Sequence, residues 1–371
     1  MVFMRDNSFA IEPPPEPTAL AAGSATVSVA LANVSLAGLD QVSAHTLLGE
    51  TPSRIPAGQG RRFRALWRAG EYRGDMQSFT GTYTALVTPF AGGQVDEAAF
   101  ARLVALQIKG GVDGIVPVGT TGESPTLSFA EHIRVIQLAV ECAAGRVKVV
   151  AGTGGNSTSE AIYLTKAAEA AGADGSLQVA PYYNKPTPEG LFQHFRAVAR
   201  ATKLPVILYN IPSRCGVELP VEVVQRLAHD CANIVGIKEA GGSPDRVSQM
   251  RQRLGSAFVV LSGDDSLTLP FMAVGAQGVV SVASNVIPRQ VANLVRAFAT
   301  GKPKLALKLH LRFFPLFRDL FLETNPAPVK AALALQGLMA ENLRLPLVPL
   351  AAANRARLKA TLTACGILPA G

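Results

Sequence analysis

Short apolar runs that recur along the chain constrain its fold more than any other feature. Eight such runs follow Gly81, about every 30 residues, and each is followed by a helical pattern, as expected for successive strand–helix units. The runs are nearly continuous in apolarity and rich in β-branched residues, which is typical of parallel strands buried on both faces. They comprise Thr84–Thr88, Gly114–Val118, Lys148–Ala151, Ser176–Ala180, Pro205–Tyr209, Val235–Lys238, Phe258–Leu261 and Gly278–Val282.

Eight units over about 210 residues predict an α/β fold, the (β/α)₈ or TIM barrel. The intervening segments agree with this, since Glu160–Ala171 and Pro220–His229 each place apolar side chains on one helical face. A doubly wound sheet is the alternative. It has fewer strands, and its dinucleotide-binding form carries G-x-G-x-x-G after the first strand, which this sequence lacks.

Residues 76–286 would form the barrel, and two further segments flank it. Residues 287–371 contain several helical stretches separated by prolines, so we expect a C-terminal helical appendage. Residues 1–75 lack the pattern and include the Pro-rich stretch Glu12–Pro17. We expect this segment to be a disordered extension or the result of a wrongly assigned start, because Met76 directly precedes the patterned sequence. The uncharged stretch Pro17–Leu39 is too weakly apolar to predict a membrane span.

Charge and cysteine content narrow the possible partners. The net charge is +8, but the main body has no Lys/Arg block and no zinc-finger or RNA-binding motif. A solvated basic surface that suits small anionic substrates is therefore favoured over nucleic-acid binding. The four cysteines form no C-x-x-C pair and fit no zinc spacing, which predicts reduced thiols in a cytoplasmic protein and no metal site.

Lys238 is the strongest candidate for chemistry. It lies at the end of the buried run Ile234–Glu239, where a charged amine is costly to desolvate. Desolvation favours the neutral amine, and a neutral lysine can attack a ketone to form a Schiff base. Alone, Lys238 is better explained as a snorkelling surface lysine.

Polar residues also follow other predicted strands, and in a barrel these positions meet at one rim. Thr120 and Thr121 follow the second strand, Tyr209 and Arg214 the fifth, and Asp264 the seventh. Each has an ordinary structural explanation, such as a helix cap or a core tyrosine. Their convergence with Lys238 predicts a lysine-dependent enzyme that forms carbon–carbon bonds.

At these residues the sequence resembles the dihydrodipicolinate synthase family, within the N-acetylneuraminate lyase-type class I aldolases. The resemblance extends from Gly81 to about Leu368 and rests on several motifs in the same order. These motifs are Gly119–Ser124, Ala151–Gly154, Pro181–Pro186, Tyr209–Arg214, Gly236–Ala240 and Leu261–Asp265.

The resemblance implies a role for each matching residue. Lys238 would form an imine with pyruvate, and Tyr209 would shuttle protons through Thr121 and through Tyr183 of a neighbouring subunit. Hydroxyls suit such a relay because each can donate and accept. The substrate-binding residues would be Thr120 and Thr121 for the pyruvate carboxylate, Arg214 for the aldehyde's carboxylate, and Val280.

The implied reaction condenses pyruvate with L-aspartate 4-semialdehyde to 4-hydroxy-tetrahydrodipicolinate, in lysine synthesis by the diaminopimelate route. The resemblance implies no cofactor, and a homodimer or homotetramer. Two alternatives remain. One is another pyruvate aldolase, acting on a sialic acid or a keto-deoxy sugar acid. The other is a non-catalytic barrel that binds a small ligand.

Two positions depart from the family pattern. Cys215 stands where Thr usually follows the arginine. In the family's pocket for feedback inhibition by lysine, Phe129 replaces a polar or basic residue of the sensitive members. We therefore predict weak or absent inhibition; in a steady-state assay, strong inhibition by submillimolar L-lysine would contradict this. The matching positions are Ser124, Pro125, Phe129, His132, Asn156, Glu160 and Tyr182.

Overall fold

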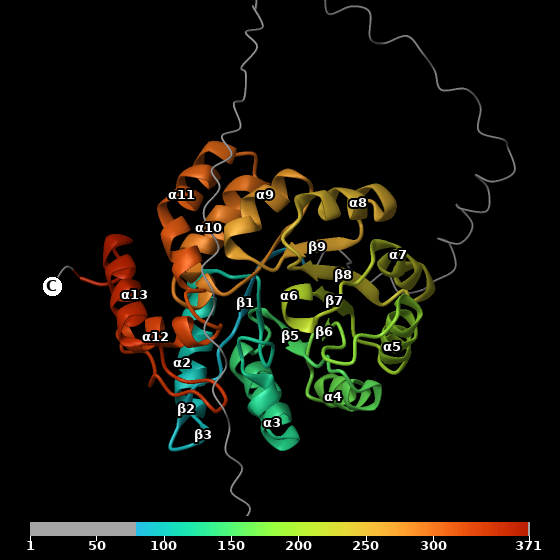
Figure 1. Cartoon of the computed structure of the whole chain (residues 1–371), viewed down its shortest axis with the longest axis horizontal. Helices are drawn as coiled ribbons and strands as arrows, with labels where there is room; N and C mark the ends of the chain where they lie inside the picture. The colour runs from blue at the N-terminus through green and yellow to red at the C-terminus, as the bar shows by residue number, and fades with distance from the viewer. Residues whose placement is uncertain (1–78, 370–371) are drawn as a thin grey trace, which may run out of the picture. The chain divides into compact units, whose positions relative to one another are not determined.

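A computed structural model describes residues 79–369, and within them eight parallel strands close into a barrel ringed by helices (Figure 1). The predicted (β/α)₈ fold is confirmed, and the doubly wound alternative is wrong. The predicted extension, residues 1–75, lies outside the described residues. In their order around the barrel, the strands are β1 (Gly81–Ala85), β10 (Gly278–Ser281), β9 (Val259–Ser262), β8 (Ile234–Glu239), β7 (Val206–Asn210), β6 (Gly175–Val179), β5 (Lys148–Gly152) and β4 (Gly114–Val116).

Seven of the predicted strands agree with the structure within two residues at each end, whereas the first lies three residues too late. Strand β1 begins at Gly81, which pairs with Gly278 of β10. The apolar run that misled the prediction continues through Leu86 and Val87, and both are buried although they follow the strand. An apolar run indicates which residues are buried, and here the buried residues continue beyond the last residue of the strand.

Local sequence explains where the surrounding helices begin. Ser128 caps α3 with a full capping box. Its hydroxyl accepts from the backbone N–H of Glu131, and the Glu131 carboxylate accepts from the backbone N–H of Ser128. Thr187 caps α5 through its hydroxyl alone, which accepts from the backbone N–H of Gly190, and Pro188 lies in the first turn. The helices of the ring are α2 (Glu97–Gly110), α3 (Phe129–Ala143), α4 (Thr158–Ala170), α5 (Pro188–Arg200), α7 (Val221–Asp230), α8 (Pro244–Leu254), α9 (Thr268–Ala273) and α10 (Pro288–Ala299).

Three more helices follow the ring and form a C-terminal appendage: α11 (Pro303–Asp319), α12 (Ala327–Leu335) and α13 (Ala352–Ala364). Helix α13 packs on α11 and α12, and these helices lie beside α10 at one side of the barrel (Figure 1). Helix α12 also contacts the short helix η5 (Ala283–Asn285), which directly follows β10. The appendage therefore reaches the end of the barrel where the polar strand-end residues lie.

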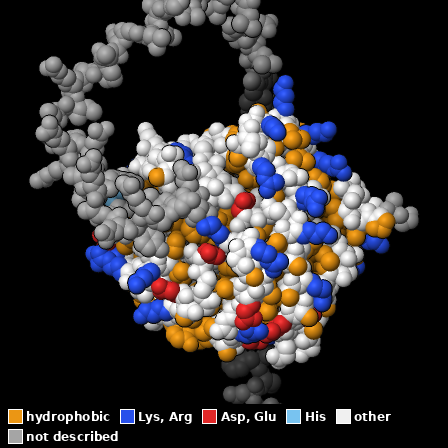
Figure 2. All heavy atoms as spheres, turned by 180° about the vertical axis from the view of Figure 1, so that it is seen from behind, with side chains coloured by type: hydrophobic (Ala, Val, Ile, Leu, Met, Phe, Trp, Pro, Cys, Tyr) orange, Lys and Arg blue, Asp and Glu red, His pale blue; other side chains and the backbone are white. Residues whose placement is uncertain are grey.

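The surface agrees with the basic composition. Figure 2 shows one face on which Lys and Arg side chains are scattered among hydrophobic and uncharged groups, with fewer Asp and Glu side chains. Scattered cations of this kind are typical of a solvated basic surface. Within residues 79–369, no helix combines the length and the apolarity that a membrane span requires.

Candidate active site

Lys238 and Tyr209 occupy paired positions on the neighbouring strands β8 and β7. The Lys238 side chain is directed toward the phenol, with Nζ 4.1 Å from the centroid of the Tyr209 ring. Both residues are buried, and Lys238 retains only 6% of its exposure. Parallel strand pairing thus brings an amine and a phenol together although 29 residues separate them in sequence.

Burial sets the protonation of this amine. Desolvation lowers the pKa of Lys238 to about 8, although the carboxylates of Asp264 and Asp265 act in the opposite direction. Burial also changes the pKa of Asp264, which it raises to about 6. Burial also raises the pKa of Tyr209, so its phenol stays protonated at neutral pH. A substantial share of the amine is therefore neutral in mildly alkaline solution.

The turn Gly119–Glu123 after β4 presents two threonines to this centre. The Thr120 hydroxyl lies close enough to the Tyr209 phenol to lower its pKa, against the larger opposing effect of burial. Thr121 instead accepts a hydrogen bond from Nδ2 of Asn325, at 3.0 Å. The turn depends on Gly122, since a Cβ there would lie 2.9 Å from the Val118 backbone. Of the two threonines, Thr120 is thus the one that influences the phenol, whereas Thr121 is engaged with Asn325.

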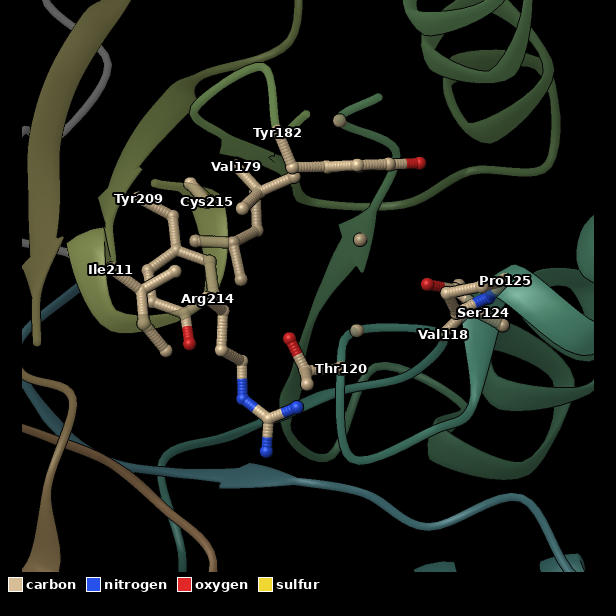
Figure 3. Close-up of a pocket in the computed structure, with 14 residues that line it drawn as sticks. Val118, Thr120, Ser124, Pro125, Val179, Tyr182, Tyr209, Ile211, Arg214 and Cys215 are labelled. Carbon is tan, nitrogen blue, oxygen red and sulfur yellow. The ribbon is translucent and has the colours of Figure 1, made fainter. Parts of the chain in front are cut away.

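Arg214 faces the same centre from the short helix α6 (Pro212–Cys215). In Figure 3 its guanidinium extends toward the side chain of Thr120. A cavity of about 220 Å³ lies between these loops, and Tyr209, Tyr182 and Ser124 also line it. The cavity is large enough for a small organic acid and carries a cationic group at its wall.

Four residues predicted as catalytic or substrate-binding do not line this cavity: Lys238, Thr121, Tyr183 and Val280. Lys238 is nevertheless adjacent to it, because its amine lies over the ring of the cavity-lining Tyr209. Val280 is buried within β10, and Thr121 is buried in the turn after β4. Tyr183 is 89% exposed and has a left-handed backbone with φ of 72°. Its hydroxyl is therefore available to another molecule rather than to the cavity of its own subunit.

Only some of the positions that match the family's lysine pocket line the cavity. Ser124, Pro125 and Tyr182 line the same cavity as Tyr209. His132 is buried, and its Nε2 is engaged with the carbonyl of Gly152 at 2.8 Å. Phe129 packs edge-on against Tyr163, with 5.9 Å between ring centroids. Glu160 lies near enough to Tyr182 to contribute, after burial, to a raised pKa of that phenol.

Cys215 is a passive residue. It is a buried free thiol, and desolvation raises its pKa to about 11. The thiol therefore stays protonated at neutral pH, and a thiol of this kind is a poor nucleophile.

Sequence reasoning missed a polar cluster that ties the turn to the C-terminal appendage. Lys330 of α12 forms an ion pair with Glu123, and neither side chain is exposed to solvent. Lys330 also donates to the carbonyl of Asn342 at 2.8 Å and lies over the ring of Phe90. Glu123 accepts in turn from the backbone N–H of Arg344 at 3.1 Å. A single lysine in the otherwise apolar segment Ala327–Leu335 was the available signal.

Comparison with known proteins agrees with this geometry. The sequence model of the Dihydrodipicolinate synthetase family matches residues 78–365. The chain belongs to this family. A curated relative from Aquifex aeolicus, a 4-hydroxy-tetrahydrodipicolinate synthase, is 51% identical over 284 residues, which cover 76% of this chain and 97% of the relative.

Solved structures of family members superpose on the same region. The 4-hydroxy-tetrahydrodipicolinate synthase of Methylacidiphilum fumariolicum SolV has a TM-score of 0.77 and is 59% identical, covering 77% of this chain and 96% of its own. The Cyanidioschyzon merolae enzyme, solved with lysine bound, also has a TM-score of 0.77 at 42% identity, covering 78% of this chain and 99% of its own. The shared region is the one that contains the barrel and the cavity.

Proposed function

We propose that this protein is a 4-hydroxy-tetrahydrodipicolinate synthase, a lyase of the class EC 4.3.3.7. It condenses pyruvate with L-aspartate 4-semialdehyde in lysine biosynthesis by the diaminopimelate pathway. The observation that carries the proposal is the buried amine of Lys238, with its lowered pKa, beside Tyr209 in a member of this family. The names of the similar proteins favour this reaction over a sialic acid or keto-deoxy sugar acid aldolase.

The reaction follows from the chemistry of a neutral amine. Lys238 Nζ attacks the ketone carbon of pyruvate, and loss of water leaves an imine. Loss of a methyl proton then gives an enamine, which attacks the aldehyde carbon of the second substrate to form the new carbon–carbon bond. The amino group of that substrate closes the ring and displaces Lys238, which returns as a neutral amine.

Nearby groups serve proton transfer and substrate binding. Tyr209, protonated and next to the imine, is placed to pass protons, and the nearby hydroxyl of Thr120 extends the path. In this proposal Thr121 belongs to the same proton path but is one residue further from Tyr209 than Thr120 is. Arg214, at the cavity wall, binds the carboxylate of the aldehyde substrate through its two-pronged guanidinium.

We further propose a cytoplasmic homodimer or homotetramer in which Tyr183 completes the neighbouring site. Support comes from its 89% exposure and its left-handed backbone, which costs about 1–3 kcal/mol for a non-glycine residue. Sedimentation tests the assembly. A monomer with full activity would rule out this role of Tyr183.

Borohydride trapping tests the function. Reduction in the presence of pyruvate should attach pyruvate to Lys238, as located by peptide mapping, and aspartate semialdehyde should then be turned over. Trapping without turnover of this aldehyde would instead indicate another pyruvate aldolase. The absence of any adduct would indicate a non-catalytic binding barrel.

The pH dependence of trapping should report the pKa of Lys238. Only the neutral amine attacks, so the trapping rate should rise about tenfold per pH unit below pH 8 and level off above it. The charge of Asp264 raises this pKa. Asp264→Asn should therefore move the whole profile to lower pH, whereas Asp245→Asn, at an exposed position on α8, should leave it unchanged. A shift to higher pH would contradict this role of Asp264.

A further inference from the structure

Asn325 joins two parts of the active site that are far apart in sequence. It lies between α11 and α12 and is 5% exposed. Its side-chain Nδ2 donates to Oγ1 of Thr121 at 3.0 Å, across 204 residues. Its backbone carbonyl accepts from Nη2 of Arg214 at 3.1 Å, across 111 residues. One residue of the appendage thus contacts both the threonine turn and the substrate-binding arginine.

The direction of the side-chain hydrogen bond follows from the chemistry of the amide. Oδ1 of Asn325 is buried and has no hydrogen-bond partner among the described residues. The opposite orientation would leave two N–H groups unpaired in the same dry surroundings, which is the costlier arrangement. Thr121 therefore acts as an acceptor toward Asn325, and its own proton is directed elsewhere.

The same stretch of chain holds the turn at a second point. Lys330, five residues after Asn325, pairs with Glu123 at the end of the turn. Glu123 has a left-handed backbone, with φ of 55°, which is unfavourable for a residue with a side chain. Two contacts from the appendage therefore hold the turn in a backbone conformation that is unfavourable for the turn on its own.

We propose that Asn325 is a positioning residue for the reaction. Its amide fixes Thr121, and through the turn it fixes Thr120 near Tyr209, while its carbonyl anchors Arg214. This inference rests on the proposed synthase function and deepens it. Only the amide contact depends on the side chain, so a substitution at Asn325 should disturb the threonines and leave the arginine in place.

Asn325→Asp tests this role because it keeps the size of the side chain and removes the donor. We expect kcat to fall about 10- to 100-fold, with little change in KM for either substrate and with unchanged trapping of pyruvate on Lys238. Asn325→Ala should give a similar loss. The matched control is Asn293→Asp, the same change at an exposed position on α10, which should keep the kcat of the unmodified protein.

A double-mutant cycle with Thr121→Val separates positioning from general damage. If Asn325 acts through Thr121, Asn325→Ala should cause no further loss of kcat in the Thr121→Val background. Additive losses, or a wild-type kcat for Asn325→Asp, would show that the positioning role is wrong while the synthase activity stands. If the unmodified protein neither traps pyruvate nor turns over the aldehyde, the proposed function is wrong, and the positioning role is wrong with it.

Discussion

Lys238→Arg should reduce turnover by at least about 10⁴-fold, because a guanidinium stays protonated and cannot form an imine. The substitution retains a positive charge beside Tyr209, so charge alone cannot restore activity. Steady-state turnover of pyruvate and aspartate semialdehyde measures the loss. Borohydride trapping should give no pyruvate adduct at position 238.

An exposed lysine provides the control for this substitution. Lys166→Arg makes the same chemical change on the surface of α4 and should keep both turnover and trapping. Thermal unfolding of the two variants checks that the fold survives. If Lys238→Arg retained turnover within tenfold of the unmodified protein, catalysis through a lysine imine would be wrong.

Lys330→Met should destabilise the fold by about 3–5 kcal/mol, because it leaves the Glu123 carboxylate buried without its counter-ion. Methionine has a similar length and is apolar, so little of the loss should come from packing. Urea unfolding gives the change in the free energy of unfolding. This effect is large compared with the total stability of a typical domain.

A double variant and a surface pair show whether the loss comes from the uncompensated charge. Glu123→Gln in the Lys330→Met background removes that charge and should recover most of the stability. Arg253→Met breaks the exposed pair with Glu222 and should cost less than about 1 kcal/mol. A loss for Lys330→Met no larger than that of Arg253→Met would show that the buried pair contributes little.

The strands were predictable because their signal is local. Apolar, β-branched runs at a regular spacing reflect burial on both faces, and seven of the eight runs agreed with the structure within two residues. Lys238 stood out for the same reason, since a charge at the end of a buried strand is visible in a few neighbouring residues. The misplaced first strand, around Leu86, shows that the same signal reports burial rather than pairing.

The barrel, the amine of Lys238 and the motifs that identify the family could all be predicted from the amino-acid sequence, because each depends on a short stretch of chain. The contacts between distant residues became evident only in the folded chain. Asn325 donates to Thr121, and Lys330 pairs with Glu123. Those contacts join residues up to 207 positions apart. No local pattern of side chains encodes them, since they depend on how the appendage packs on the rim of the barrel.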